Sequence, residues 1–124
     1  MKTVSEIEST LNGFYGTENY YKHWLGLQYT DGVHYLAESA ECHWLLDAIA
    51  SHQLKLKKWS RLQDFQVWRL KRDSTKFPKG ALLECFDDIP GQRFVLQELE
   101  YTDFPLNEIK LYVENGVILL PSEH

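Results

Sequence analysis

The fold is decided by three runs of strand-like sequence, FQVWRLK (65–71), ALLECF (81–86) and RFVLQELEY (93–101). Each run is rich in apolar and aromatic residues, and turn-forming residues separate it from the next. In the last run, Val95 and Leu99 alternate with charged residues such as Glu98, a pattern typical of a strand with one face in water. The three runs therefore predict an antiparallel meander.

A helix is predicted just upstream of the meander, over residues 40–53, with Ser39 as its cap. Its apolar residues recur at helical spacing, so we expect it to be the central helix of the core. The basic residues that follow, 54–63, either extend this helix or form a loop around Trp59, and both alternatives stay open.

The N-terminal third begins with an amphipathic pattern that predicts a helix over residues 3–12, capped by Thr3 or Ser5. Further along, Asp31-Gly32 lies between two apolar or aromatic runs. Asp-Gly in such a place is a strong hairpin signal, because both positions of the tight turn need a positive φ. We therefore expect a hairpin here, with Asp31 as a turn residue.

The C-terminal segment is predicted to form a short helix and a last strand. Asp103 can cap a helix that runs from residue 104 to 113, and Asn115-Gly116 can end it. Residues 117–120 then form the strand.

Together these elements predict one α+β domain over residues 1–124, an antiparallel sheet of about five strands with the central helix packed on one face. The 124 residues are 44% hydrophobic, enough for one core and too few for two. The acidic start is unlike a signal peptide, and no run is long and apolar enough for a membrane span, which favours the cytoplasm. Cys42 and Cys85 are far apart in sequence and are expected to be buried free thiols.

Charge is distributed unevenly along the chain, whose net charge is −5. Nine of the 13 Lys and Arg residues lie between residues 55 and 79. This block could bind an anion or nucleic acid, or it could pair with the acidic residues of the protein itself, which is the favoured interpretation. The residues expected to form an anion-binding face are Lys55, Lys57, Lys58, Arg61, Arg69 and Lys71.

Aromatic residues are concentrated between residues 14 and 35, where seven large rings exceed what one short hairpin can bury. Either the core covers them, or some of them form a surface for a partner. The residues expected to contact a protein partner, or a second copy of the chain, are Tyr20, Tyr21, Trp24, Tyr29 and Tyr35.

The histidines offer only thin grounds for catalysis. His43 and Asp47 are four residues apart on one predicted helical face, where the carboxylate could orient the imidazole. An ordinary ion pair is the favoured interpretation, and a small enzyme using these two residues with His34 is the alternative. No histidine spacing matches a metal site, so neither a metal nor a cofactor is predicted.

Several runs resemble a family of small uncharacterised bacterial proteins, a domain of unknown function. They are WLG (24–26), YTDGV (29–33), YLAE (35–38), WLLDAI (44–49), FQVW (65–68), YTDFP (101–105) and the tail IKLYVENGVILLP (109–121). The resemblance covers residues 16–123 and implies a single domain, with no assigned catalytic or binding residues. From the residues themselves, a non-enzymatic interaction module is the first hypothesis, and polyanion binding through residues 55–79 is the second.

Overall fold

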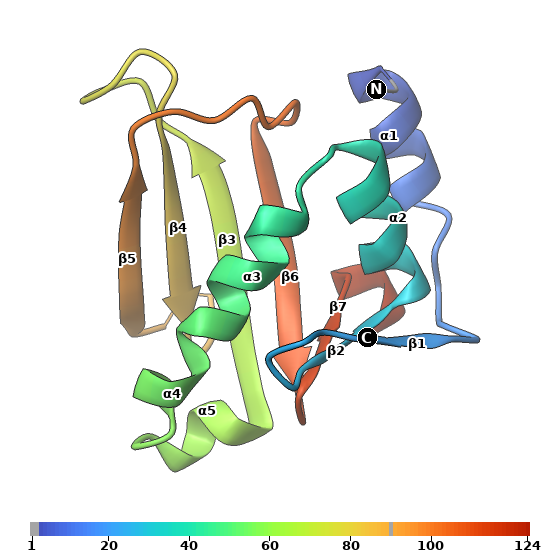
Figure 1. Cartoon of the computed structure of the whole chain (residues 1–124), viewed down its shortest axis with the longest axis vertical. Helices are drawn as coiled ribbons and strands as arrows, with labels where there is room; N and C mark the ends of the chain where they lie inside the picture. The colour runs from blue at the N-terminus through green and yellow to red at the C-terminus, as the bar shows by residue number, and fades with distance from the viewer. Residues whose placement is uncertain (1–2, 90) are drawn as a thin grey trace.

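A computed structural model describes residues 3–89 and 91–124, and its seven strands form one sheet (Figure 1). The strands are β1 (Tyr20–Lys22), β2 (Gln28–Thr30), β3 (Phe65–Arg72), β4 (Ala81–Phe86), β5 (Arg93–Leu99), β6 (Glu108–Glu114) and β7 (Val117–Leu119). Their order in the sheet is β1-β2-β7-β6-β3-β4-β5. β2 and β7 are parallel and the other neighbours antiparallel, so the α+β class is right, while an antiparallel sheet of about five strands is wrong in detail.

The predicted meander is confirmed as β3, β4 and β5. Because side chains alternate along a strand, the sheet has two different faces. Trp68 and Leu70 on β3 are buried beside Cys85 and Leu83 on β4, and they form the core face with the helices. The opposite face carries charged residues among the apolar ones. On this face Glu84 of β4 forms an ion pair with Arg69, its neighbour on β3.

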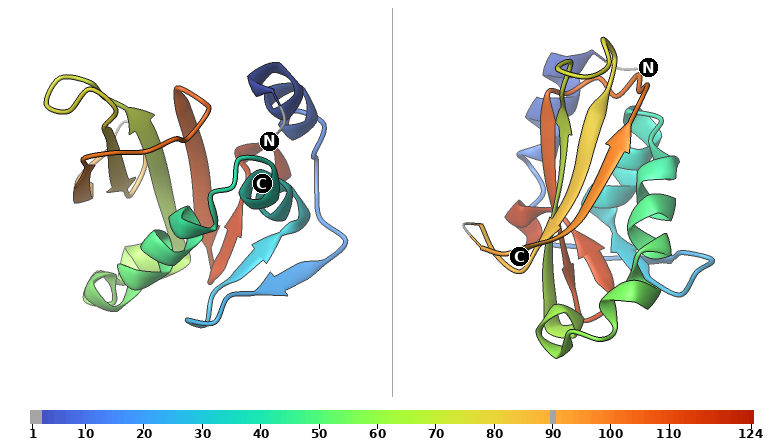
Figure 2. Two further views of the ribbon diagram at one scale, coloured as in Figure 1. Left: turned by 45° about the horizontal axis from the view of Figure 1, so that its top comes forward. Right: turned by 90° about the vertical axis from the view of Figure 1, so that its left-hand side faces the viewer.

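The helices are α1 (Val4–Leu11), α2 (Asp31–Ser39), α3 (His43–Ser51), α4 (Gln53–Leu56) and α5 (Ser60–Asp64), with a 3-10 turn η1 (Pro121–Glu123). Figure 2 shows α2, α3 and α4 on one side of the sheet and α5 at the end of β3, and α3 crosses in front of β3 and β6 in Figure 1. The N-terminal helix is confirmed, with the Thr3 side chain accepting a hydrogen bond from the Glu6 amide. Its buried residues Ile7 and Leu11 join the core.

The predicted central helix exists but is shorter than residues 40–53. It begins at His43, and Cys42 at its N-cap position makes no side-chain capping bond. Ser39, the expected cap, is instead the last residue of α2. Residues 54–63 form neither one continuous extension of the helix nor a simple loop. They contain two separate short helices, α4 and α5, with Trp59 at the N-cap of α5.

The predicted hairpin around Asp31-Gly32 is wrong, because these residues begin α2. The Thr30 hydroxyl accepts a hydrogen bond from the Val33 amide, and Asp31 lies in the first turn, where the helix dipole favours a negative charge. The downstream residues Val33, Leu36 and Ala37 are buried at helical spacing. This helical period outweighs the turn signal of Asp31-Gly32.

The predicted helix over residues 104–113 is also wrong, because this segment contains strand β6. Leu111 and Val113 are buried and alternate with more exposed residues, which is the period of a strand. Asn115 and Gly116 have φ values of 50° and 81° and join β6 to β7. Asn-Gly is thus a tight hairpin turn and not a helix stop. The last strand, β7, is confirmed.

Candidate functional site

The aromatic segment divides between the surface and the core. Trp24 and Tyr20 have exposed fractions of 78% and 58%. Tyr21 and Tyr29 are half-buried and stack on each other, with ring centroids 5.4 Å apart. Tyr35 is also half-buried, with its ring against Phe14. Since Tyr20 and Tyr21 are neighbours in β1, their side chains point to opposite faces, and the five predicted residues do not form one continuous patch.

Asp47 fixes the β1–β2 loop (residues 23–27) against α3. Its Oδ1 atom lies 2.6 Å from Nε2 of His23 and accepts a hydrogen bond from the Trp24 indole at 3.3 Å. Nδ1 of His23 accepts the Leu25 amide hydrogen, so Nε2 carries the proton that His23 donates to Asp47. The His23 side chain is buried, and both of its ring nitrogens hold the loop in place.

The predicted pair His43 with Asp47 does not form, because each residue has another partner. His43 lies 3.4 Å from a carboxylate oxygen of Glu38, and His34 lies 4.0 Å from the same oxygen. The Tyr21 ring stacks on His34 at 4.2 Å. His34 and His43 are therefore brought together around an acid, but that acid is Glu38 and not Asp47.

The two cysteines are confirmed as buried free thiols. Burial raises the pKa of each thiol to about 12, and nearby carboxylates, Asp103 for Cys42 and Asp87 for Cys85, add to the effect. Both therefore remain protonated and unreactive at neutral pH. Among residues 3–89 and 91–124, His, Cys, Asp and Glu side chains do not converge in groups that could hold a metal ion.

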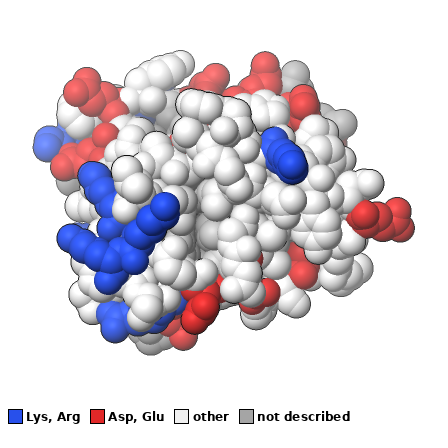
Figure 3. Space-filling view, turned by 60° about the horizontal axis from the view of Figure 1, so that its bottom comes forward, with Lys and Arg blue, Asp and Glu red and all other residues white. Residues whose placement is uncertain are grey.

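The basic block separates into two parts. Arg69 and Arg61 pair with acids of the protein itself, Glu84 at 2.7 Å and Asp87 at 3.4 Å. Lys71 is exposed at the end of β3. Lys55, Lys57 and Lys58 form the other part, on and just after α4, and none of them has an ion pair with a described residue. Figure 3 looks toward the end of the molecule that carries α4, and it shows Lys and Arg gathered on the left of this view.

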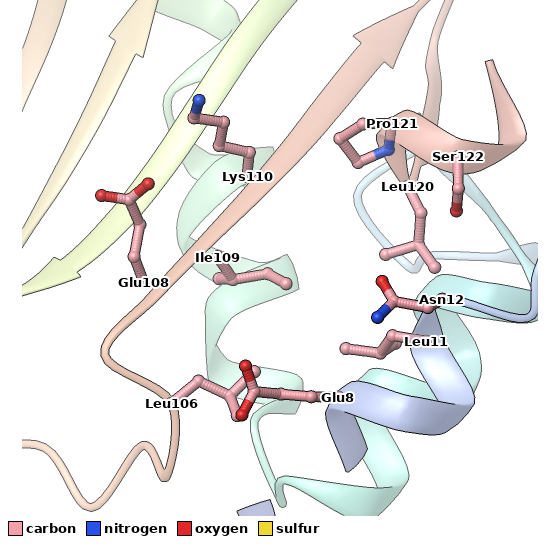
Figure 4. A pocket seen from close by; sticks show the side chains of 10 residues that line it. All are labelled: Glu8, Leu11, Asn12, Leu106, Glu108, Ile109, Lys110, Leu120, Pro121 and Ser122. Atoms are coloured by element: carbon pink, nitrogen blue, oxygen red, sulfur yellow. The ribbon is translucent and has the colours of Figure 1, made fainter. Parts of the chain in front are cut away.

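Two hollows lie beside strand edges. One has a volume of about 390 Å³ and lies between α1, the start of β6 and η1 (Figure 4). Leu11, Ile109 and Leu120 point into its middle, while the charged groups of Glu108 and Lys110 point outward, so its ionisable groups do not converge. The other has a volume of about 510 Å³ and lies between α4 and β5.

The model of a family of unknown function (DUF6876) matches residues 5–124. The chain belongs to this family. The family is described only as one of unknown function, so membership assigns no activity to any residue, and its bacterial origin stays a prediction. No curated protein and no solved structure matches the chain. In the part of the chain that the structure describes, every helix is too short or too polar to span a lipid bilayer.

Proposed function

We propose that the protein is a non-enzymatic interaction module that contacts a protein partner through its β1–β2 loop. The contact surface, which we name the loop surface, consists of Trp24, Leu25, His43 and Asp47. Trp24 carries the proposal, because the residue is 78% exposed while its indole N–H is held by Asp47. Tryptophan is enriched among the residues that dominate protein interfaces, and a side chain already fixed in place loses less entropy on binding.

The neighbouring residues support this assignment. Leu25 is 46% exposed beside Trp24, and His43 lies one helical turn before Asp47 on α3. The surface thus combines an aromatic anchor, an aliphatic side chain and polar groups, the usual composition of a binding patch. The two buried free thiols favour a reducing compartment, so we place this module in the cytoplasm. The partner is another protein or a second copy of the chain.

Photo-crosslinking from position 25 tests the proposal. A benzophenone amino acid at Leu25, with Trp24 retained, is expected to give one discrete adduct in the protein's own cells, and its mass distinguishes a 14.6 kDa second copy from another protein. Trp24→Ala is expected to weaken the contact about tenfold, so that the adduct is lost. Tyr101→Ala, which removes another exposed ring, is the matched control and should leave the adduct intact. Failure to form any adduct would contradict the proposal.

Asp47→Ala gives a second test, because it loosens Trp24 without removing it. Since His23 is only 8% exposed and loses its acceptor, we expect the free energy of unfolding to fall by about 1 kcal/mol in chemical denaturation. The crosslink from position 25 should also weaken, because the indole is no longer held. An unchanged crosslink in a destabilised variant would show that fixing the indole does not matter for binding.

A further inference from the structure

The hollow beside β5 runs along the edge of the sheet, and we name it the β5 groove. Phe94, Val95 and Leu96 all line it. Consecutive residues of a strand point to opposite faces, so all three can line one groove only if it follows the strand's edge. β5 is the outermost strand in Figure 1, and within the described residues it pairs with β4 alone. Every second residue of β5 therefore presents its N–H and C=O groups along this open edge, and the groove meets the edge at residues 94–96.

The walls of the β5 groove are apolar and partly uncovered. Trp59 packs against Phe94 with ring centroids 5.0 Å apart, forming an aromatic wall. Leu54 and Leu96 also line the groove, with exposed fractions of 76% and 46%. Exposed leucines beside an open strand edge favour association with another chain.

The charge of the β5 groove is positive and uncompensated. Lys55 and Lys58 line it, and Lys57 lies between them in sequence. No carboxylate of the described residues forms an ion pair with these lysines, although Arg61 nearby pairs with Asp87. Nζ of Lys58 lies 4.4 Å from the centre of the Trp59 ring, so the charge is held at the aromatic wall. The groove therefore complements a negatively charged ligand with apolar parts.

We propose that the β5 groove binds an extended acidic segment of a partner protein, which pairs with β5 as an additional strand and places carboxylates against Lys55 and Lys58. Addition of a strand to a sheet edge is a common mode of peptide recognition, in which backbone bonds give affinity and side-chain sites give specificity. The proposal concerns a surface separate from the loop surface. It does not depend on the proposal made for Trp24.

Two other occupants fit the groove less well. Nucleic acid could contact the lysines, but a phosphate backbone cannot match the alternating donors and acceptors of a strand edge. A second copy could also join through its own β5, with the helices of both copies on the same side of the joined sheet. The β5 residues of that copy that face α4 of the first would then be Val95, Gln97 and Leu99. These residues carry no charge, so a second copy would leave Lys55 and Lys58 uncompensated.

Titration with a fluorescein-labelled peptide of alternating Glu and Val, ten residues long, tests the proposal. We expect saturable binding that weakens as salt rises, because exposed charges are screened. In nuclear magnetic resonance spectra, amide shifts should concentrate at residues 93–99 and 54–59. N-methylation of alternate backbone amides of the peptide should weaken binding about tenfold, since it removes the hydrogen bonds to β5. Binding that survives N-methylation would overturn strand addition.

Matched charge reversals separate this site from others. Lys55→Glu with Lys58→Glu is expected to weaken binding at least about tenfold with only a small loss of thermal stability, because neither lysine is ion-paired and only the exposed contact of Lys58 with Trp59 is lost. Lys71→Glu with Lys110→Glu, at exposed lysines outside the groove, should leave the affinity unchanged. Trp24→Ala should also have no effect, which separates failure here from failure of the loop surface. If the peptide does not bind, or if single-stranded DNA binds the same lysines more tightly, the proposal is wrong.

Discussion

Replacing Gly32 with valine is expected to lower the free energy of unfolding by about 2 kcal/mol, because a side chain there would displace the ends of two neighbouring side chains. A Cβ atom at this position would lie 2.5 Å from Cδ1 of Leu120 and 2.7 Å from Oε1 of Glu123. Leu120 is buried, and the Glu123 carboxylate accepts hydrogen bonds from the Thr30 hydroxyl and the Gly32 amide. The substitution would therefore push away the groups that hold the N-terminus of α2.

Gly16→Val is the matched control, because a Cβ at Gly16 would meet no atom within 4 Å. Urea unfolding followed by circular dichroism should show a change below about 0.5 kcal/mol for this variant. Equal stability of the two variants would mean that the packing of Leu120 and Glu123 against α2 is unimportant. A tight turn would have required a positive φ at Gly32, whereas the structure gives a steric reason for glycine at this position.

Glu84→Gln is expected to cost about 2 kcal/mol at neutral pH, because it removes the charge from a buried acceptor. The Glu84 side chain is only 5% exposed and accepts hydrogen bonds from Arg69 at 2.7 Å and from Arg93 at 2.9 Å. Both arginines are partly in water, so the loss should be smaller than for a fully buried ion pair. Glu98→Gln, which breaks only the exposed pair with Lys76, should change stability much less.

The effect of Glu84 should depend on pH. Burial alone would raise the pKa of Glu84, but Arg69 and Arg93 outweigh it and hold the pKa below its ordinary value of 4.5. A lowered pKa stabilises the folded state above pH 4.5, and this stabilisation is lost as the pH falls through the folded-state pKa. The difference between parent and Glu84→Gln should therefore shrink in acid. A difference that is constant with pH would rule out the carboxylate charge as its cause.

The strands of the meander could be predicted because each is a short run of apolar and aromatic residues between turn-forming residues, and because β5 also alternates between buried and exposed positions. The errors arose where a short motif fits two structures. Asp31-Gly32 suits a tight turn and also the first turn of a helix, and Glu123, far away in sequence, holds the helical form. Likewise, Asn115-Gly116 can end a helix or join two strands, and β6 is fixed by its pairing with β3.

Individual candidate residues could be named from the sequence, but which of them lie together could not be predicted. The sequence singled out Trp24 as well as Lys55 and Lys58, and all three are exposed. It paired His43 with Asp47 because they are one helical turn apart, yet Asp47 binds His23 from a different element. The β5 groove also depends on tertiary structure, because it joins a helix that precedes the meander to the last strand of the meander.

The parallel pairing of β2 with β7 has a consequence for how the chain folds during synthesis. Gln28 and Tyr29 pair with Val117 and Ile118, so β2 has no neighbour on that side until residues 117 and 118 have left the ribosome. Contacts so distant in sequence form slowly, since a long loop must close before they can contribute. We therefore expect the nascent N-terminal half to wait with one edge of β2 unpaired until β7 has been made, and to need protection from aggregation until then.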